Sequence, residues 1–305
     1  MSSSENERLS VAGFRPHGYV GLAIIVAAEA LLFAGNNLVG EWFTPIVWTG
    51  FLLFVDALVC RAEGRSLVVK DRLELLVVAV VSIACWWLFE FYNAPRFWSS
   101  DLELWWHYHN LEPNPYLRRV GYDWAFATIF PAMFLTAELF AATLFRRLSN
   151  KRRVVLPRAL LFALIAAGAL MALAPLLFVS KWLVPFVWLS YALMLDPLNA
   201  LRGWPSITCD IARGDWRRLV ALLAAGGACG VLWEFWNYWA ATKWTYTVPY
   251  LGGVKLFEMP VVGFLGFPPF AVECWAMYVF CRSLLTPSAR AGERDWRGLW
   301  PTSGE

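Results

Sequence analysis

Long apolar runs alternate along the chain with shorter segments that hold most of its charges. We read eight such runs, at 19–35, 43–60, 73–92, 122–145, 157–178, 182–196, 218–240 and 262–284. A helix needs about 20 apolar residues to cross the ~30 Å hydrocarbon core of a bilayer. Because the bilayer offers no water to backbone groups, each run is expected to be a helix, and the lack of polar–apolar alternation argues against a β-barrel. The pattern predicts an all-α polytopic membrane protein with about eight transmembrane helices.

Composition agrees with this interpretation. Hydrophobic residues make up 59% of the chain and charged residues 16%, against about a quarter charged in soluble domains. The net charge of +3 comes from basic connecting segments, and no basic stripe is interleaved with exposed aromatic residues on a soluble module. We therefore expect the lipid bilayer and a hydrophobic small molecule or lipid as partners, and no nucleic acid.

Basic residues predict the orientation. If the N-terminus is inside, 20 of the 26 lysines and arginines fall in inner segments and six in outer ones. The positive-inside rule then places both termini in the cytoplasm. The N-terminal segment has no cleavage site, so no removable signal peptide is expected. We predict a multi-pass protein of the inner (cytoplasmic) membrane.

The two halves of the chain resemble each other. EWFTPIVWTGFLLFVDAL at 41–58 matches KWLVPFVWLSYALMLDPL at 181–198, and CWWLFEFYN at 85–93 matches CGVLWEFWN at 229–237. Further matches follow in the same order: Trp106-x-Tyr108 with Trp244-x-Tyr246, Asp123 with Glu258, and Glu138 with Glu273. Collinear matches of this kind indicate an internal repeat. We predict a first four-helix membrane repeat at 1–150, with a cytoplasmic N-terminus, and a second at 151–305, with a cytoplasmic C-terminal tail.

An even number of spans in each repeat means that both copies enter the membrane from the same side. The copies are then parallel, same-orientation repeats related by a pseudo-twofold axis along the membrane normal. A site shared by the copies is expected at the interface between them.

Acidic residues inside the predicted helices are the candidates for catalysis. Each costs at least ~2.5 kcal/mol on insertion scales, so a functional role is the default hypothesis. The set comprises Glu29, Glu90, Glu234, Glu138 and Glu273. Glu90 and Glu234 belong to an outer tier and Glu138 and Glu273 to an inner one. Glu29 has no acidic counterpart, since the matching position of the second half is Ala169, so it suits a step that needs one proton donor. Each acid has the alternative of being a hydrogen-bonded packing residue.

Aromatic and polar residues near the outer tier are the candidates for substrate binding. Glu90 and Glu234 each precede an asparagine by three residues, which places both side chains on one helix face. The full set is Asn93, Asn237, Asp123, Glu258, Trp87, Trp233, Trp236, Trp106, Tyr108, Trp244 and Tyr246. Some of the 19 tryptophans would form an interfacial belt. The others fit an aromatic pocket for a lipid tail, an isoprenoid or a cation.

Other signatures of chemistry are weak or missing. His107 and His109, with Asp101, Glu103 and Glu112 nearby, form the one candidate for a divalent metal, but the matching positions in the second half are Thr245 and Thr247. No nucleophile elbow, P-loop or dinucleotide fingerprint is present. We predict no cofactor. The six cysteines form no Cys-x-x-Cys pair and are expected to be reduced packing residues. Gly226 and Gly230 form a Gly-x-x-x-Gly string, which indicates close helix packing.

Three functions remain open. The first is an integral membrane enzyme that acts on an isoprenoid or other lipid by carboxylate acid–base chemistry in an aromatic-lined intramembrane pocket. The second is a proton-coupled transporter of a small molecule or lipid that uses the two tiers of carboxylates. The third is a non-catalytic subunit of a membrane complex. The enzyme predicts an asymmetric pocket open sideways to lipid, and the transporter a near-symmetric cavity open to one aqueous face. We favour the enzyme, because Glu29 breaks the symmetry.

Overall fold

The computed structural model describes residues 13–94, 105–148, 153–178, 180–247, 253–285 and 299. In this part of the chain eight helices are long and apolar enough to cross a membrane. The first half supplies α2 (Pro16–Phe33), α4 (Phe43–Glu63), α5 (Arg72–Asn93) and α6 (Pro115–Ala142). The second half supplies α7 (Arg158–Leu177), α8 (Val184–Leu201), α10 (Arg217–Trp239) and α11 (Phe267–Leu284). The expected helical, multi-pass architecture with eight candidate spans is confirmed.

Short elements connect these helices. They are α3 (Asn37–Glu41), α9 (Ile207–Arg213), the 3-10 turns η1 (Lys181–Leu183) and η2 (Val261–Gly266), and the strands β1 (Trp106–His109), β2 (Lys243–Tyr246), β3 (Lys255–Leu256) and β4 (Met259–Pro260). β1 pairs antiparallel with β2, and β3 with β4. The first of these pairs joins segments from the two halves of the chain. The β1–β2 pair was not predicted from the sequence.

Among the described helices, α6 and α8 extend furthest beyond their predicted ends. α6 begins at Pro115, well before the predicted start at 122, because the Asn114 side chain accepts hydrogen bonds from the backbone N–H groups of Tyr116 and Leu117. α8 continues through Pro197 to Leu201. Its last turns are fixed to α11 by Asn199, whose Nδ2 donates to the Ala276 carbonyl at 3.0 Å.

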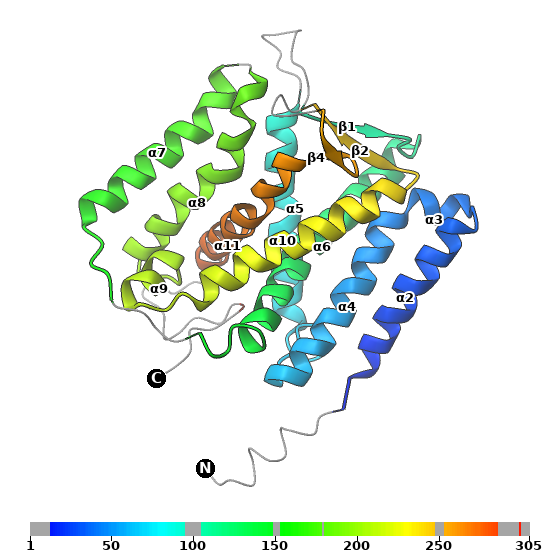
Figure 1. Cartoon of the computed structure of the whole chain (residues 1–305), viewed down its shortest axis with the longest axis horizontal. Helices are drawn as coiled ribbons and strands as arrows, with labels where there is room; N and C mark the ends of the chain where they lie inside the picture. Colours follow the sequence, from blue (N-terminus) through cyan, green and yellow to red (C-terminus); the bar gives the residue numbers. More distant parts are fainter. Residues whose placement is uncertain are drawn as a thin grey trace.

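Helix pairs pack through small residues. α2 lies along α4 and α7 along α8, while α4 packs on α6 and α8 on α11. A Cβ added at Gly21 of α2 would lie 2.5 Å from the Gly50 carbonyl oxygen of α4, and one at Gly168 of α7 would lie 2.6 Å from the Met194 nitrogen of α8. Figure 1 shows α2 and α7 on opposite flanks, with the β1–β2 pair at one end of the bundle. Close backbone approach through glycine is the usual basis of packing within membranes.

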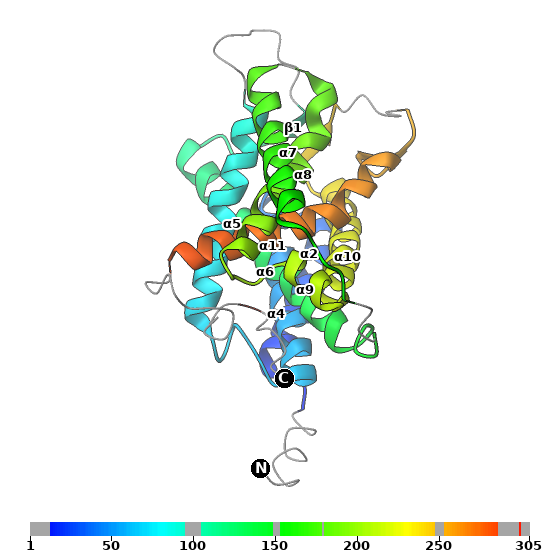
Figure 2. The ribbon, with the colours of Figure 1, turned by 90° about the vertical axis from the view of Figure 1, so that its left-hand side faces the viewer.

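The centre of the molecule is built by α6 and α11. Phe130, Phe134, Trp275 and Tyr278 from these helices are almost completely buried. Figure 2 shows α11 crossing α5 at a steep tilt. This crossing brings α11 against helices of both halves, since it contacts α10, α8, α5 and α6.

A hydroxyl group inserted into α6 shapes the N-terminal half of this helix. Pro131 has no N–H to donate, and next to it Ser82 of α5 donates to the Phe126 carbonyl at 2.5 Å and accepts from the Phe130 N–H at 3.1 Å. A proline and an inserted polar side chain are both recognised causes of helix bending. The N-terminal part of α6, which lines the cavity described below, is thereby held by α5.

Asp56 and Asp196 anchor the connections that follow their helices. Asp56 accepts hydrogen bonds from the Ser66 hydroxyl at 2.5 Å and the Leu67 N–H at 2.7 Å. Asp196 accepts from the Ile207 N–H at 2.7 Å. Both carboxylates are buried, and backbone N–H donors at this distance satisfy them.

Candidate functional site

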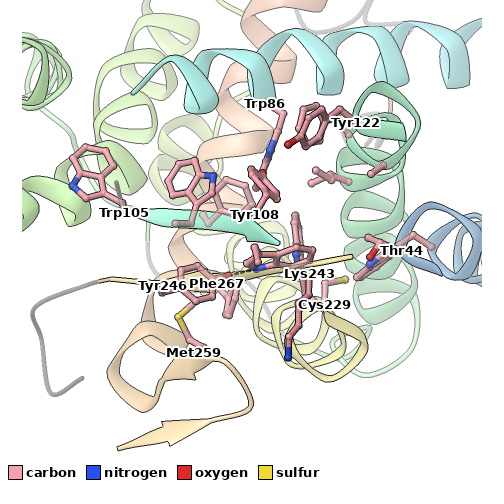
Figure 3. Close-up of a pocket in the computed structure, with 18 of the residues that line it drawn as sticks. Thr44, Trp86, Trp105, Tyr108, Tyr122, Cys229, Lys243, Tyr246, Met259 and Phe267 are labelled. Atoms are coloured by element: carbon pink, nitrogen blue, oxygen red, sulfur yellow. Dashed lines mark hydrogen bonds between the residues drawn. The ribbon is translucent and has the colours of Figure 1, made fainter. Parts of the chain in front are cut away.

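A cavity of about 510 Å³ lies beside the β1–β2 pair, between helices of both halves (Figure 3). This volume falls in the range of roughly 300–1,000 Å³ that is typical of small-molecule sites. Eight tryptophans, three tyrosines and three phenylalanines line it, so its wall is largely aromatic. The charged lining residues are Glu41, Glu112, Arg118 and Lys243.

The β1–β2 pair presents alternate residues to the cavity. Trp106 and Tyr108 of β1 pair with Tyr246 and Trp244 of β2, respectively, and all four side chains line the cavity. Successive side chains of a strand point to opposite faces. The sheet therefore forms one wall of the cavity with these four side chains, and Lys243 at the start of β2 also lines the cavity.

The histidines belong to the other face of this sheet. His107 Nε2 lies 3.1 Å from the Thr247 hydroxyl, and His109 Nε2 lies 2.8 Å from the Thr245 hydroxyl. Within the part of the chain that the structure describes, no group of three His, Cys, Asp or Glu side chains is placed to hold a metal ion. Asp101 and Glu103, which the sequence places near these histidines, lie outside the described residues.

Asn93 and Asn237 hold the strands to the helices. Asn93 donates to the Trp106 carbonyl at 2.9 Å and accepts from the Trp105 N–H at 2.8 Å. Asn237 donates to the Trp244 carbonyl at 2.8 Å and accepts from the N–H of the same residue at 2.9 Å. Each asparagine side chain therefore supplies hydrogen-bond partners to backbone N–H and C=O groups at the edge of a strand. Neither asparagine lines the cavity.

Glu90 lies behind the aromatic wall. Its Oε1 accepts hydrogen bonds from the Tyr108 hydroxyl at 2.5 Å and from the indole N–H groups of Trp86 and Trp106, both at 3.2 Å. The three donors line the cavity, whereas Glu90 itself does not. The side chains of these three donors therefore lie between the Glu90 carboxyl group and the cavity.

Glu234 has a similar position in the second half but fewer partners. It is completely buried, and its Oε1 accepts from the Tyr246 hydroxyl at 2.7 Å. Its Oε2 has no hydrogen-bond partner among the described residues. The Trp244 indole donates to the Tyr246 hydroxyl at 2.7 Å. A chain of indole, phenol and carboxyl groups thus runs from the cavity wall into the interior.

The two strand tyrosines remain neutral donors. Burial raises the pKa of Tyr108 and of Tyr246 well above the ordinary value, and the adjacent carboxyl group, Glu90 or Glu234, raises it further. A phenol in this state keeps its proton at neutral pH. Each tyrosine can therefore pass a hydrogen bond between the cavity and the carboxyl group behind it.

Glu29 lies on the flank of the molecule. It is half-buried on α2, and its Oε1 accepts from the Trp236 indole of α10 at 2.9 Å. Trp236 in turn meets Trp48 edge to face at 5.1 Å between ring centroids. Neither Glu29 nor Trp236 lines the cavity, although Trp48 does.

The two inner-tier glutamates have structural partners. Glu138 forms an ion pair with Arg65 at 3.1 Å. Glu273 is completely buried and accepts from the backbone N–H of Tyr191 on α8 at 2.8 Å. They do not line the cavity, so the structure separates the inner tier from the aromatic site.

Asp123 and Glu258 are paired with basic residues. Asp123 accepts from the Trp87 indole at 2.7 Å and from Arg119 at 2.8 Å. The Arg119 guanidinium lies 4.1 Å from the Trp87 ring centroid, in cation–π geometry. Glu258 pairs with Lys243 at 2.6 Å. Of this group only Lys243 lines the cavity.

Several lining residues were missed from the sequence. Trp48 and Trp188 contact Trp233 and Phe89, respectively, at centroid distances of 5.9 and 5.2 Å, so each aromatic pair joins one half to the other. The sequence did contain a signal for Trp48 and Trp188, because they are matched positions of the two halves. Trp86 stacks on Trp233 at 5.3 Å. This contact joins positions that are not matched between the two halves, although both tryptophans belong to the cluster near Glu90 and Glu234 in the sequence.

One face of α6 was also missed. Arg118, Tyr122, Ile129 and Met133 all line the cavity, and their spacing of four, seven and four positions places them on one side of a helix. The periodicity is readable in the sequence, but it marks a packed face as readily as a cavity.

From the candidates for substrate binding, the structure thus brings Trp106, Tyr108, Trp233, Trp244 and Tyr246 together around the cavity. Comparison of the chain with protein-family models, with curated proteins and with solved structures found no match.

Proposed function

We propose that the protein is a membrane enzyme that acts on a lipid or isoprenoid in the aromatic cavity by acid–base chemistry. The observation that carries this proposal is the pair of contacts Tyr108–Glu90 and Tyr246–Glu234, in which a cavity-lining phenol is hydrogen-bonded to a carboxyl group behind it. A proton can move from carboxyl to phenol to substrate, or back, without opening the cavity to water. Positioned acid–base groups typically contribute about 10²–10⁴-fold to rate.

The two pairs have different roles in this proposal. Glu90 Oε1 is stabilised by three donors, which suits a carboxylate. Glu234 accepts one hydrogen bond, from Tyr246, with the Trp244 indole nearby, and its Oε2 has no partner among the described residues. A buried carboxyl group so poorly satisfied is costly as an anion. Glu234 with Tyr246 is therefore assigned as the proton donor, and Glu90 with Tyr108 as the acceptor.

The internal repeat is part of this proposal. Matched residues make matched contacts: Asn93 and Asn237 hold the strands. Asp56 and Asp196 hold the loops by accepting from the backbone N–H groups of the matched residues Leu67 and Ile207. The pairing of Trp106 with Tyr246 and of Tyr108 with Trp244 is what a twofold axis through the β1–β2 pair would produce. These contacts support two parallel copies with a shared cavity between them.

The asymmetry of the cavity favours the enzyme over the transporter. α6 contributes Arg118 and Tyr122, whereas the matching positions of the second half, Gly253 and Phe257, do not line the cavity. The residues Leu117, Val262 and Leu265 line it and are also exposed at the surface of the molecule. An asymmetric cavity with apolar side chains at its mouth suits a substrate that enters from the membrane.

Proton-coupled transport is the second candidate, and Glu273 favours it. This carboxyl group is completely buried on α11, and its Oε2 has no hydrogen-bond partner among the described residues. A relay would need such a group to exchange protons between the two tiers. Its present bond to the Tyr191 N–H of α8 would have to break in every cycle, which is why we rank transport second.

The experiment compares lipid extracts from a strain that lacks the gene and is complemented with wild type, Glu234→Gln, Tyr246→Phe or Asp215→Asn. Asp215 is the matched control, because it is an acid just before α10 that bonds Arg217 and lines no part of the cavity. We expect wild type and Asp215→Asn to convert one lipid or isoprenoid to a product seen by mass spectrometry. Glu234→Gln and Tyr246→Phe should reduce conversion by about 10² or more. Full conversion in Glu90→Gln/Glu234→Gln would exclude the proposed chemistry.

A further inference from the structure

The lining face of α6 changes character along its length. Arg118 and Tyr122 occupy its first turns, and Ile129 and Met133 follow deeper in the helix. From Arg118 to Met133 the helix rises about 22 Å. The cavity therefore has a polar end beside the outer loops and an apolar end within the bundle.

Arg118 lines the polar end without a counter-charge. Arg118 is half-buried, and its side chain makes no hydrogen bond or ion pair with any residue in the described ranges. Its neighbours differ: Arg119 is bonded to Asp123, and Lys243 to Glu258. A guanidinium group has a planar fork of donors that matches the oxygens of a phosphate or carboxylate. An unpaired one beside an apolar cavity is a site for an anion.

Tyr122 adds a second donor one helical turn further on. Its side chain is directed at the cavity (Figure 3). Its hydroxyl group has no hydrogen bond to the part of the chain that the structure describes, in contrast to Tyr108 and Tyr246, which bond Glu90 and Glu234. Arg118 and Tyr122, four positions apart, project from the same face of α6.

Two acids at the rim restrict the charge of the ligand. Glu41 and Glu112 are neighbouring acids that both line the cavity. Partial burial and the nearby Glu112 carboxylate raise the pKa of Glu41, because like charges close together disfavour each other. Such a pair repels a multiply charged anion. A ligand with one negative charge matches Arg118, the one guanidinium group among the described residues that line the cavity.

We propose that the cavity binds an elongated lipid with a singly charged anionic head group, its head on Arg118 and Tyr122 and its tail along Ile129 and Met133. This inference rests on the proposed function only in taking the cavity as the substrate site. The class includes lipids with a single phosphodiester or carboxylate. It excludes diphosphates and neutral hydrocarbons.

Binding is tested by native mass spectrometry of delipidated protein in detergent. The probes are lysophosphatidylglycerol and lysophosphatidylcholine with the same tail, and inorganic phosphate as a competitor. The variants are Arg118→Gln and Tyr122→Phe. The matched control is Arg119→Gln, because Arg119 stands next in the chain but is paired with Asp123 outside the cavity. Size-exclusion chromatography confirms that each variant is folded.

We expect wild type and Arg119→Gln to bind lysophosphatidylglycerol at least about tenfold more tightly than lysophosphatidylcholine. Arg118→Gln should abolish this preference, and Tyr122→Phe should reduce it severalfold. Millimolar inorganic phosphate should not compete, since it lacks the tail. Three results would overturn the proposal: an unchanged preference in Arg118→Gln, an equal loss in Arg119→Gln, or displacement of the lipid by inorganic phosphate.

Measuring lipid conversion by the same variants tests the anionic site and the proposed enzymatic function separately. Conversion of a lipid by wild type without any head-group preference would refute the anionic site and leave the enzyme. A preference that depends on Arg118, with no conversion by wild type, would support the anionic site and refute the enzyme.

Discussion

Tyr108 and Tyr246 occupy matched positions, yet the carboxyl groups behind them are satisfied to different degrees. Glu90 receives donors from Tyr108, Trp86 and Trp106, while Glu234 receives one from Tyr246. Leaving a buried polar group without a partner costs about 1–3 kcal/mol. The two tyrosines should therefore differ in what they contribute to stability.

We predict that Tyr246→Phe destabilises the protein by about 1–3 kcal/mol, because Glu234 then loses the hydrogen bond described for it. Tyr108→Phe should cost less, since two indole donors remain on Glu90. Thermal unfolding of both variants in the same detergent measures the difference. Equal losses of stability would mean that the number of donors does not decide the cost.

For single residues, the sequence indicated which residue types matter but did not show which way their side chains point. The Glu-x-x-Asn spacing correctly placed each pair on one helix face, but the asparagines bind strand backbone instead of facing the cavity. Spacing along one helix cannot reveal which external backbone lies opposite. The sequence also does not show that Arg118 lacks a side-chain partner among the described residues. This depends on the acids nearby, because Asp123 pairs with Arg119 and Glu258 pairs with Lys243.

The helices were the most predictable elements. Each spanning helix must satisfy its own backbone in the bilayer, so a long apolar run leaves little choice of structure. The two-stranded β1–β2 sheet was not predicted, because its strands lie in different halves of the chain and each is only four residues long. Strands of four residues can be recognised in a sequence only when the strand that pairs with them is known.

Close packing of α10 on α11 is an element-scale feature that the Gly-x-x-x-Gly string did predict. A Cβ at Gly226 would collide with the Phe267 carbonyl oxygen, and one at Gly230 with the Phe267 ring. Phe267 also lines the cavity. Any residue larger than glycine at 230 must push this ring aside.

We predict that Gly230→Leu lowers the unfolding temperature and weakens lipid binding, because Phe267 is displaced toward the cavity. The matched control is Gly227→Leu on the same helix, where the nearest atom to an added Cβ is 3.8 Å away. Thermal unfolding and lipid titration should leave the control close to wild type. A control as damaged as Gly230→Leu would show that a bulky residue anywhere on α10 is harmful.

At the scale of the whole molecule, orientation is the property that the charge pattern predicts and that the helices alone do not decide. The β1–β2 pair, whose residues line the cavity, lies at the end of the bundle opposite to the C-terminal end of α4 (Figure 1). Arg61 lies in the last turn of α4, which leads into a segment predicted to be inside. The proposed orientation therefore places the cavity in the outer half of the membrane.

We predict that the variant Lys70→Cys is labelled by a membrane-impermeant maleimide only after the membrane is opened, and that Pro113→Cys is labelled in intact cells. Both positions are exposed. Wild type, in which Cys60, Cys85, Cys229 and Cys274 are buried, gives the background. The opposite pattern would invert the proposed topology and place the cavity in the inner half.

The strand pair between the two halves has a consequence for biosynthesis. The helices α6, α7, α8 and α10 are all made after β1 and before β2, so during that interval Trp106 and Tyr108 stand on a strand whose partner does not yet exist. An unpaired strand edge is open to pairing with other chains. The binding chamber is therefore completed late in synthesis, and a nascent first half has to be shielded until the second half arrives.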